Sequence, residues 1–171
     1  MSFFNIVAAT NEDTVVATYE PSKARSDSYQ SEAELEKEFI RLLCEQGYTY
    51  LPLHTEDELI ANLRSQLEEL NHYHFSDTEW RQFFSDVIAN PNEHIPEKTR
   101  KIQEDNVQVL HRDDGSSKNI TLIDKKNIHN NRLQVINQYE VKQADGARHD
   151  NRYDVTILVN GFPLVHVELK R

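Results

Sequence analysis

The sequence predicts an α/β fold in α+β order, in which helices come first along the chain and a mixed sheet follows. Between residues 31 and 104, apolar residues recur at helical spacing, and capping signals precede them. From residue 105 onward, β-branched and aromatic residues form short runs that Gly and Asp separate. Helices followed by strands are typical of an α+β domain.

Three helices are predicted between residues 31 and 90, after a mobile arm with one short strand near residues 14–18. Each helix begins with a capping box: Ser31 with Glu34, Thr55 with Glu58, and Ser76 with Glu79. The first ends at Gly47, and a short helical turn is predicted after Pro96. The buried face of the first helix is predicted to contain Leu35, Phe39, Leu42 and Leu43, with Cys44 beside them in the core.

Strands are predicted at residues 107–111, 119–123, 133–141, 153–159 and 163–170. The segment 153–159 is apolar on both faces apart from Asp154 and Thr156, which indicates a central strand. The predicted domains are an N-terminal arm, 1–30, and a mixed-sheet domain, 31–171. This second domain is predicted to be helical over 31–104, including a helical insertion, and stranded over 105–171.

Composition limits the possible classes of protein. The 171 residues suit one domain, and the apolar content of 37% is below the ~45–50% typical of globular domains. A single cysteine excludes an internal disulfide and a thiolate metal cluster. No signal peptide and no membrane span is predicted, so we expect a cytoplasmic protein without a membrane partner.

The charge is unevenly distributed along the chain. The net charge of −10 argues against a chain wrapped by nucleic acid. Residues 1–100 contain 8 basic and 19 acidic side chains, whereas residues 101–171 contain 11 basic and 10 acidic ones. Any DNA contact is therefore predicted in the second part, at residues such as Lys125, Lys126 and Arg132. A solvated surface of mixed charge is the alternative.

The last predicted strand contains an acid and a lysine two residues apart. Alternation places Glu168 and Lys170 on one face, with His166 as a further candidate for DNA contact. Val167 and Leu169 then point toward a core. Two carboxylates, Asp154 and Glu168, with a lysine on a sheet can hold Mg²⁺ and hydrolyse a phosphodiester. An ordinary charged strand is the alternative, because Glu-x-Lys is a common spacing.

This site requires Asp154 to lie on the same face as Glu168. A two-residue turn at Asn160-Gly161 would align residue 154 with 167, on the wrong face. A three-residue loop over 159–161 would align 154 with 166, and one over 160–162 would align 154 with 168. The sequence therefore predicts one of these loops or an equivalent bulge.

The run NRYDVTILVNGFPLVHVELKR, residues 151–171, closely resembles the N-terminal nuclease segment of the R (restriction and motor) subunit of type I restriction–modification enzymes. SEAELEKEFIRLLCEQGY is similar to that family's first helix, and LIDKKNIHNNRLQVINQYE is similar to its strand approach to the metal site. The resemblance covers residues 28–171. It implies a truncated PD-(D/E)xK nuclease core, because the family's second helix and a further strand are expected downstream.

The resemblance also implies the chemistry. Asp154, Glu168 and Lys170 would be the catalytic acid, acid and lysine, and Mg²⁺ would be held by Asp154, Glu168 and the Leu169 carbonyl. The implied activity is that of a type I site-specific deoxyribonuclease, which cleaves unmodified foreign double-stranded DNA after ATP-driven translocation. ATP would bind in motor domains that this chain lacks, since it contains no GxxxxGK. We expect little activity from this fragment alone.

A further carboxylate is predicted on the first helix, where related nucleases carry a Glu that points at the metal site. At about 100° per residue, Glu36 falls between Phe39 and Ile40 within the apolar arc. Glu34 and Glu38 face away from this arc. Glu36 is therefore the predicted additional catalytic residue, and a local ion pair at the helix edge is the alternative.

The implied partners are double-stranded DNA and the methylation and specificity subunits of a restriction complex. Two other functions are open at this point. The helical stretch 55–103 is absent from a minimal nuclease and would suit a non-catalytic docking module that joins the motor to the methyltransferase core. A standalone repair or resolvase nuclease is the third possibility.

Overall fold

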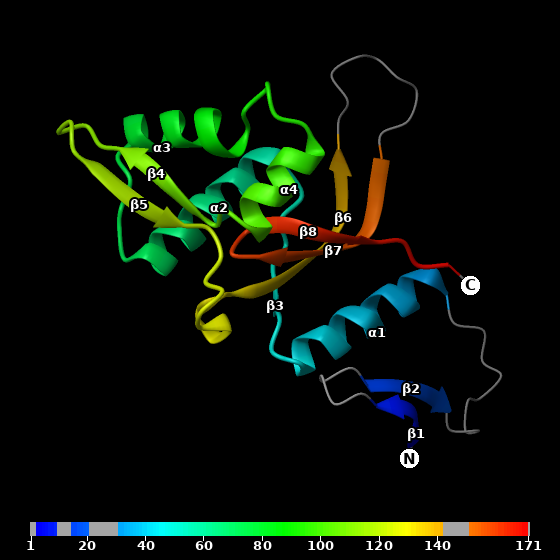
Figure 1. Ribbon diagram of the computed structural model, residues 1–171. Helices are drawn as coiled ribbons and strands as arrows, with labels where there is room; N and C mark the ends of the chain where they lie inside the picture. The colour runs from blue at the N-terminus through cyan, green and yellow to red at the C-terminus, as the bar shows by residue number, and fades with distance from the viewer. Residues whose placement is uncertain (1–2, 10–14, 21–30, 142–150, 171) are drawn as a thin grey trace. The chain divides into compact units, whose positions relative to one another are not determined.

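A computed structural model of the chain describes residues 3–9, 15–20, 31–141 and 151–170 (Figure 1). The chain divides into two units, Met1–Ser31 and Glu32–Arg171. In the first unit, strands β1 (Phe3–Ala9) and β2 (Val15–Glu20) pair antiparallel. The single strand predicted near residues 14–18 corresponds to β2. Strand β1 was not predicted, because the apolar run of residues 3–9 shows no alternation.

The second unit is built on a four-stranded mixed sheet in the order β3-β6-β7-β8. Its strands are β3 (Thr49–Tyr50), β6 (Leu133–Val141), β7 (Asn151–Val159) and β8 (Phe162–Val167). β3 runs parallel to β6, whereas β7 is antiparallel to both of its neighbours. Val155, Thr156 and Leu158 of β7 are fully buried, which confirms the predicted central strand. The sheet and its helices confirm the predicted fold class.

Helices cover both faces of this sheet. Because successive residues of a strand point to opposite faces, each strand can pack against both helical layers. The helices are α1 (Glu32–Glu45) and α2 (Glu56–Asn71), and Figure 1 shows the sheet between them. The core on the α1 side contains Leu43, Val135 and Val155, and the core on the α2 side contains Leu59, Ile136 and Leu158. Neighbouring residues of β6 thus anchor different helices.

The residues after α2 form an extension that packs on this helix. It contains α3 (Asp77–Phe83) with a π-helical turn (Phe84–Ile88), α4 (Ile95–Gln103), and the hairpin of β4 (Val107–His111) and β5 (Ser117–Thr121). A 3₁₀ turn, Ile128–Asn130, leads back to the sheet. The capping boxes predicted for α2 and α3 are confirmed. α4 is longer than the predicted turn, and β5 begins two residues earlier than predicted.

Two predictions for α1 are wrong. Cys44 is exposed instead of lying in the core, and Leu42 is 41% exposed. Both residues lie about 100° around the helix from the buried Leu43, on opposite sides of it. A helix that rests on a sheet buries a narrow stripe, so these flanking positions reach solvent. Separately, none of the helices in the described part of the chain is long and apolar enough to cross a membrane.

The turn between β7 and β8 packs against the backbone of α2. Gly161 has a φ of +83°, and a Cβ placed there would lie 2.6 Å from the Cα of Leu63. We expect Gly161→Ala to lower the free energy of unfolding by at least ~2 kcal/mol, because both the positive φ and the contact oppose a side chain. Thermal unfolding measures this loss. Gly115→Ala is the matched control, since Gly115 has a φ of +81° but no atom within 4 Å of the added Cβ. Equal losses in the two variants would contradict the packing argument.

Candidate functional site

The register between β7 and β8 depends on a two-residue turn followed by a bulge. Asn160 and Gly161 form the turn, and both have positive φ. The register then shifts by one at Leu164, which has no partner on β7. Beyond the bulge Val155 pairs with Val167, so the same register aligns residue 154 with residue 168. The three-residue loops are not formed, but the predicted equivalent bulge is.

Strand β6 departs from regular geometry at Gln138, the residue opposite Asp154. Its φ is +56°, whereas pairing with β7 continues on either side of it. On β7, Val155 packs in the core on the α1 side, and Asp154 lines a hollow beside α1. A regular strand would place these two successive residues on opposite faces. Asp154 and Val155 therefore both border the α1 side, next to the positive φ of Gln138.

The hollow has a volume of about 340 Å³ and contains two half-buried carboxylates, Glu36 and Asp154. Its lining residues are Glu32, Ala33 and Glu36 of α1, Gln138 of β6 and Asp154 of β7. Glu36 accepts hydrogen bonds from Asn137 Nδ2, at 2.6 Å, and from Gln138 Nε2. It thus faces the sheet, and its hydrogen-bond partners among the described residues are amides.

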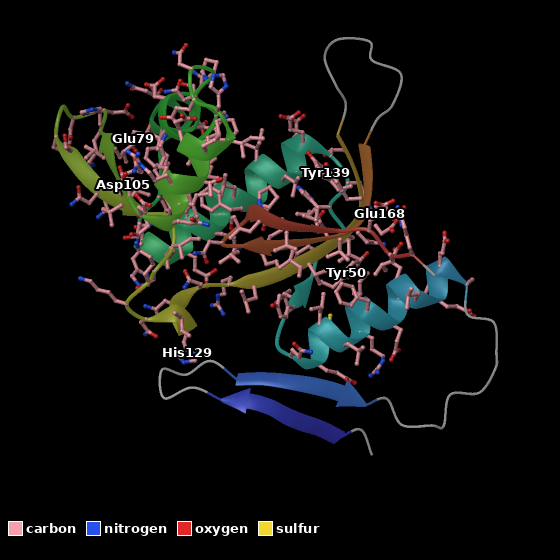
Figure 2. The ribbon with its side chains drawn as sticks, turned by 45° about the vertical axis from the view of Figure 1, so that its right-hand side comes forward. Tyr50, Glu79, Asp105, His129, Tyr139 and Glu168 are labelled. Atoms are coloured by element: carbon pink, nitrogen blue, oxygen red, sulfur yellow. The ribbon has the colours of Figure 1, made fainter. Side chains whose placement is uncertain are left out.

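Asp154 also forms a hydrogen bond with the segment that follows β8. Its Oδ2 accepts the N–H of Leu169 at 2.8 Å, which holds the carboxylate at the backbone between Glu168 and Lys170. Lys170 Nζ lies 3.2 Å from Glu168 Oε1, and these side chains are 76% and 67% exposed. Neither of the two lines the hollow, so the register that aligns residues 154 and 168 does not by itself bring the Glu168 side chain to the face on which Asp154 lies. Figures 1 and 2 show this segment running toward the end of α1 at which the helix begins.

Three hydrophobic and aromatic contacts hold the last strand. Val167 and Leu169 pack in the core on the α1 side, as predicted. His166 stacks on Tyr153 with ring centroids 4.0 Å apart, and its Nδ1 lies 3.0 Å from Thr156 Oγ1. Partial desolvation lowers the pKa of His166 below its ordinary value, although the side chain still reaches solvent. This shift favours the neutral ring and so weakens His166 as a cation for a DNA phosphate.

The other predicted DNA contacts lie toward the opposite end of the sheet. Lys125 Nζ donates to the carbonyls of Gln103 and Glu104 at the C-terminal end of α4, and Arg132 pairs with Glu69 at 2.5 Å. Lys126, the next residue after Lys125, is exposed to solvent. Arg132 adjoins the pair of residues 133 and 159, five residues along β7 from residue 154, or roughly 17 Å. The structure does not bring these cations to the hollow.

Sequence reasoning missed the amide side chains of β6. Asn137 and Gln138 both contact Glu36, and Asn137 Oδ1 accepts the hydroxyl of Tyr50 at 2.8 Å. Adjacent amides in a strand carry no periodic signal, since alternation predicts that they point in opposite directions. Only the packing of α1 on β6 reveals that they share a partner.

The donor set of the hollow suits a hard cation. Over residues 31–139 and 153–170, no group of three or more His, Cys, Asp or Glu side chains is placed to enclose a metal ion. Mg²⁺ is usually bound by one or two carboxylates, and water and substrate phosphate complete its shell. Glu36 and Asp154 present oxygen donors of this kind. The arrangement fits Mg²⁺ shared with a substrate better than an enclosed structural metal.

Several known proteins are similar to this chain in sequence. The family model described as the N terminus of the type I restriction enzyme R protein matches residues 29–171. The chain is 45% identical over 166 residues to the type I restriction enzyme EcoprrI endonuclease subunit of Escherichia coli, covering 96% of this chain and 52% of that relative. It is also similar to two staphylococcal proteins. Identity is 35% over 148 residues to the SsaAORF53P endonuclease subunit of Staphylococcus saprophyticus, and 36% over 149 residues to the SauMSSORF170P endonuclease subunit of Staphylococcus aureus.

The staphylococcal matches cover 84% of this chain but 15% of each relative. The chain thus spans about half the length of the Escherichia coli relative and a smaller share of the other two. The family model, in contrast, covers the whole of the second unit, including the candidate site. The chain therefore belongs to the family of type I restriction enzyme R proteins, with similarity to their N-terminal region.

Proposed function

We propose that this chain is the Mg²⁺-dependent endonuclease segment of a type I restriction enzyme R subunit, which hydrolyses phosphodiester bonds in unmodified foreign DNA. The observation that carries the proposal is the position of Asp154. Its carboxylate lies in the same hollow as Glu36 and accepts a hydrogen bond from the backbone between Glu168 and Lys170. The relatives named above are endonuclease subunits, which supports the same assignment.

The residues have distinct roles in this proposal. Asp154 and Glu36 would hold Mg²⁺, and the Glu168 carboxylate and the Leu169 carbonyl would complete the protein donors. When bound, Mg²⁺ supplies Lewis-acid polarisation of the scissile phosphate. The N–H of Leu169 orients the Asp154 carboxylate before substrate arrives, which lowers the cost of assembling the site. Lys170, held beside Glu168, screens negative charge that develops on the phosphate.

The size of the hollow supports cleavage at its rim. A volume of about 340 Å³ suits a small ligand and is far too small for duplex DNA. The scissile phosphate must therefore meet the site from outside. The exposed side chains of Glu168 and Lys170, which adjoin the Asp154 contact, suit a position at which a large substrate approaches.

The remaining partners belong to the same proposal. The net charge of −10 opposes tight binding of DNA by this chain alone, so another part of the enzyme must present the DNA. We assign that role to ATP-driven motor domains outside this chain, and recognition of the target to the methylation and specificity subunits. The proposed location is the cytoplasm, where bacterial DNA is found.

Glu168→Ala tests the assignment with little risk of unfolding, because the Glu168 side chain is 67% exposed. In a restriction complex whose endonuclease subunit contains this chain, we expect at least ~10²-fold slower DNA cleavage, since a metal-binding carboxylate is lost. Cleavage and complex assembly are measured separately. Glu104→Ala is the matched control, as Glu104 is 69% exposed and pairs with Arg100. Cleavage at the wild-type rate in Glu168→Ala would sink the nuclease assignment.

A non-catalytic docking module is the second candidate, and one observation favours it. An apolar hollow of about 520 Å³ lies between α4 and β8 and exposes Ile95, at 81%, and Leu164, at 42%. Exposed apolar patches often mark contacts with other proteins. Wild-type cleavage in Glu168→Ala would support docking, and so would loss of complex assembly when the exposed Leu164 is replaced by Asp. The endonuclease-subunit relatives favour either of these functions over a standalone repair or resolvase nuclease.

A further inference from the structure

We propose that Asn137 and Gln138 of β6, together with Tyr50 of β3, are positioning residues that orient the Glu36 carboxylate toward the metal held with Asp154. The proposal rests on the proposed function, and it assigns a role to three residues that do not themselves bind metal. Its starting point is that Glu36 comes from α1, whereas Asp154 comes from the sheet. Their relative position therefore depends on contacts between these two elements.

Two amides determine the orientation of the Glu36 carboxylate. Asn137 Nδ2 donates to Oε1, and Gln138 Nε2 donates to Oε2. Each oxygen thus receives one hydrogen bond, which opposes rotation of the carboxylate. Because a carboxylate oxygen has about two lone pairs, each oxygen retains one for a cation in the hollow.

The backbone of β6 is distorted in a way that allows this contact. In a regular strand, Asn137 and Gln138 would point to opposite faces of the sheet. The φ of +56° at Gln138 departs from that geometry, and both amides reach the same carboxylate. A positive φ is uncommon for a residue with a long side chain, and such conformations concentrate at functional sites.

Tyr50 extends the arrangement to a third element. Its hydroxyl donates to Asn137 Oδ1 at 2.8 Å. This bond selects the orientation of the Asn137 amide in which Nδ2, not Oδ1, faces Glu36. Figure 2 shows Tyr50 on the α1 side of the sheet and Tyr139 on the other side, where Tyr139 packs with the α2-side core.

The test is metal binding by the 171-residue chain, with Mn²⁺ as the probe because it shares the oxygen-rich octahedral sites of Mg²⁺. Isothermal titration calorimetry gives the dissociation constant. We expect Gln138→Gly, which accepts a positive φ but lacks the amide, to raise this constant by about 10-fold or more. Tyr50→Phe should raise it by about 3- to 10-fold. Tyr139→Phe is the matched control and should bind Mn²⁺ as wild type does.

A double-mutant cycle separates positioning from simple attachment of α1. In a Glu36→Gln background, Tyr50→Phe and Gln138→Gly should no longer change Mn²⁺ affinity, because their effect passes through Glu36. Wild-type affinity in both single variants, with only a lower thermal midpoint, would overturn the inference and leave the proposed function intact. If the wild-type chain does not bind Mn²⁺ and Asp154→Asn leaves DNA cleavage at the wild-type rate, the proposed function fails and the inference fails with it.

Discussion

Asp154→Asn should reduce DNA cleavage by at least ~10³-fold in a restriction complex that contains this chain. The substitution removes the negative charge but retains a side-chain oxygen that can accept the N–H of Leu169. The strand and the hollow should therefore keep their shape. We expect a loss of this size in the chemical step, because Asp154 lies in the hollow with Glu36 and is also hydrogen-bonded to the segment that carries Glu168 and Lys170.

The stability of Asp154→Asn should equal or exceed that of the wild type when no metal is present. Glu36 and Asp154 line one hollow, and two like charges without a cation repel each other. Functional sites often carry such a cost in stability. The measurements are the single-turnover cleavage rate, complex assembly and the thermal midpoint of the same preparation. Cleavage within ~10-fold of wild type would exclude Asp154 as a metal-binding residue.

Glu79→Ala should produce the largest loss of stability among single substitutions in the helical extension, at least ~3 kcal/mol. Glu79 is 5% exposed, and its carboxylate accepts three hydrogen bonds. The donors are the N–H of Ser76 at 3.0 Å, the hydroxyl of Tyr73 at 2.7 Å and the N–H of Asp113 at 3.2 Å. Removing the carboxylate leaves these groups without their partner and separates α3 from the β4–β5 turn, where Figure 2 labels Glu79.

The stabilisation from Glu79 should depend on pH. Burial alone would raise the pKa of Glu79, but the hydrogen bonds from Ser76, Tyr73 and Asp113, with the nearby Arg112 charge, lower the pKa below its ordinary value of 4.5. The folded chain therefore binds this proton less readily than the unfolded chain does. The stabilisation is fully present above pH 4.5 and is lost as the pH falls further, through the lowered pKa.

Urea denaturation of wild type and Glu79→Ala from pH ~7 down to pH ~3.5 measures this dependence. The difference in unfolding free energy should be largest near neutral pH and should shrink in acid. Glu104→Ala again serves as the exposed control, with a small effect that does not follow this profile. A Glu79→Ala difference that stays constant across the range would mean that packing, not the charged hydrogen bonds, accounts for the loss.

The helical extension contributes to the fold more than to the proposed site. Its core joins α2, α3 and the β4–β5 hairpin, and Phe162 of β8 links that core to the sheet. The hollow with Asp154 lies on the other side of the sheet, next to α1. We therefore expect substitutions such as Glu79→Ala to affect stability and docking before they affect the chemistry.

Local sequence patterns predict most of the helices and strands. The capping boxes at Thr55 and Ser76 predict where α2 and α3 begin, because each depends on two residues only three positions apart. β6 spans the predicted residues, and β7 is buried on both faces as its apolar pattern indicates. The need for a bulge in the last hairpin also followed from strand parity alone. Asp154, Glu168 and Lys170 could be predicted as site residues because all three lie within the short segment 151–171, whose spacing and family resemblance are both readable from the sequence.

Which side chains come into contact depends on tertiary packing. Glu36 and Asn137 are 101 residues apart in the chain, and no local pattern predicts their hydrogen bond. The same holds for the positive φ of Gln138 and for the exposure of Cys44, both of which sequence reasoning missed. The physical reason is that capping and alternation arise from near neighbours, whereas the packing of α1 on the sheet selects backbone distortions that break alternation. The candidate site is formed where that packing prevails over the local pattern.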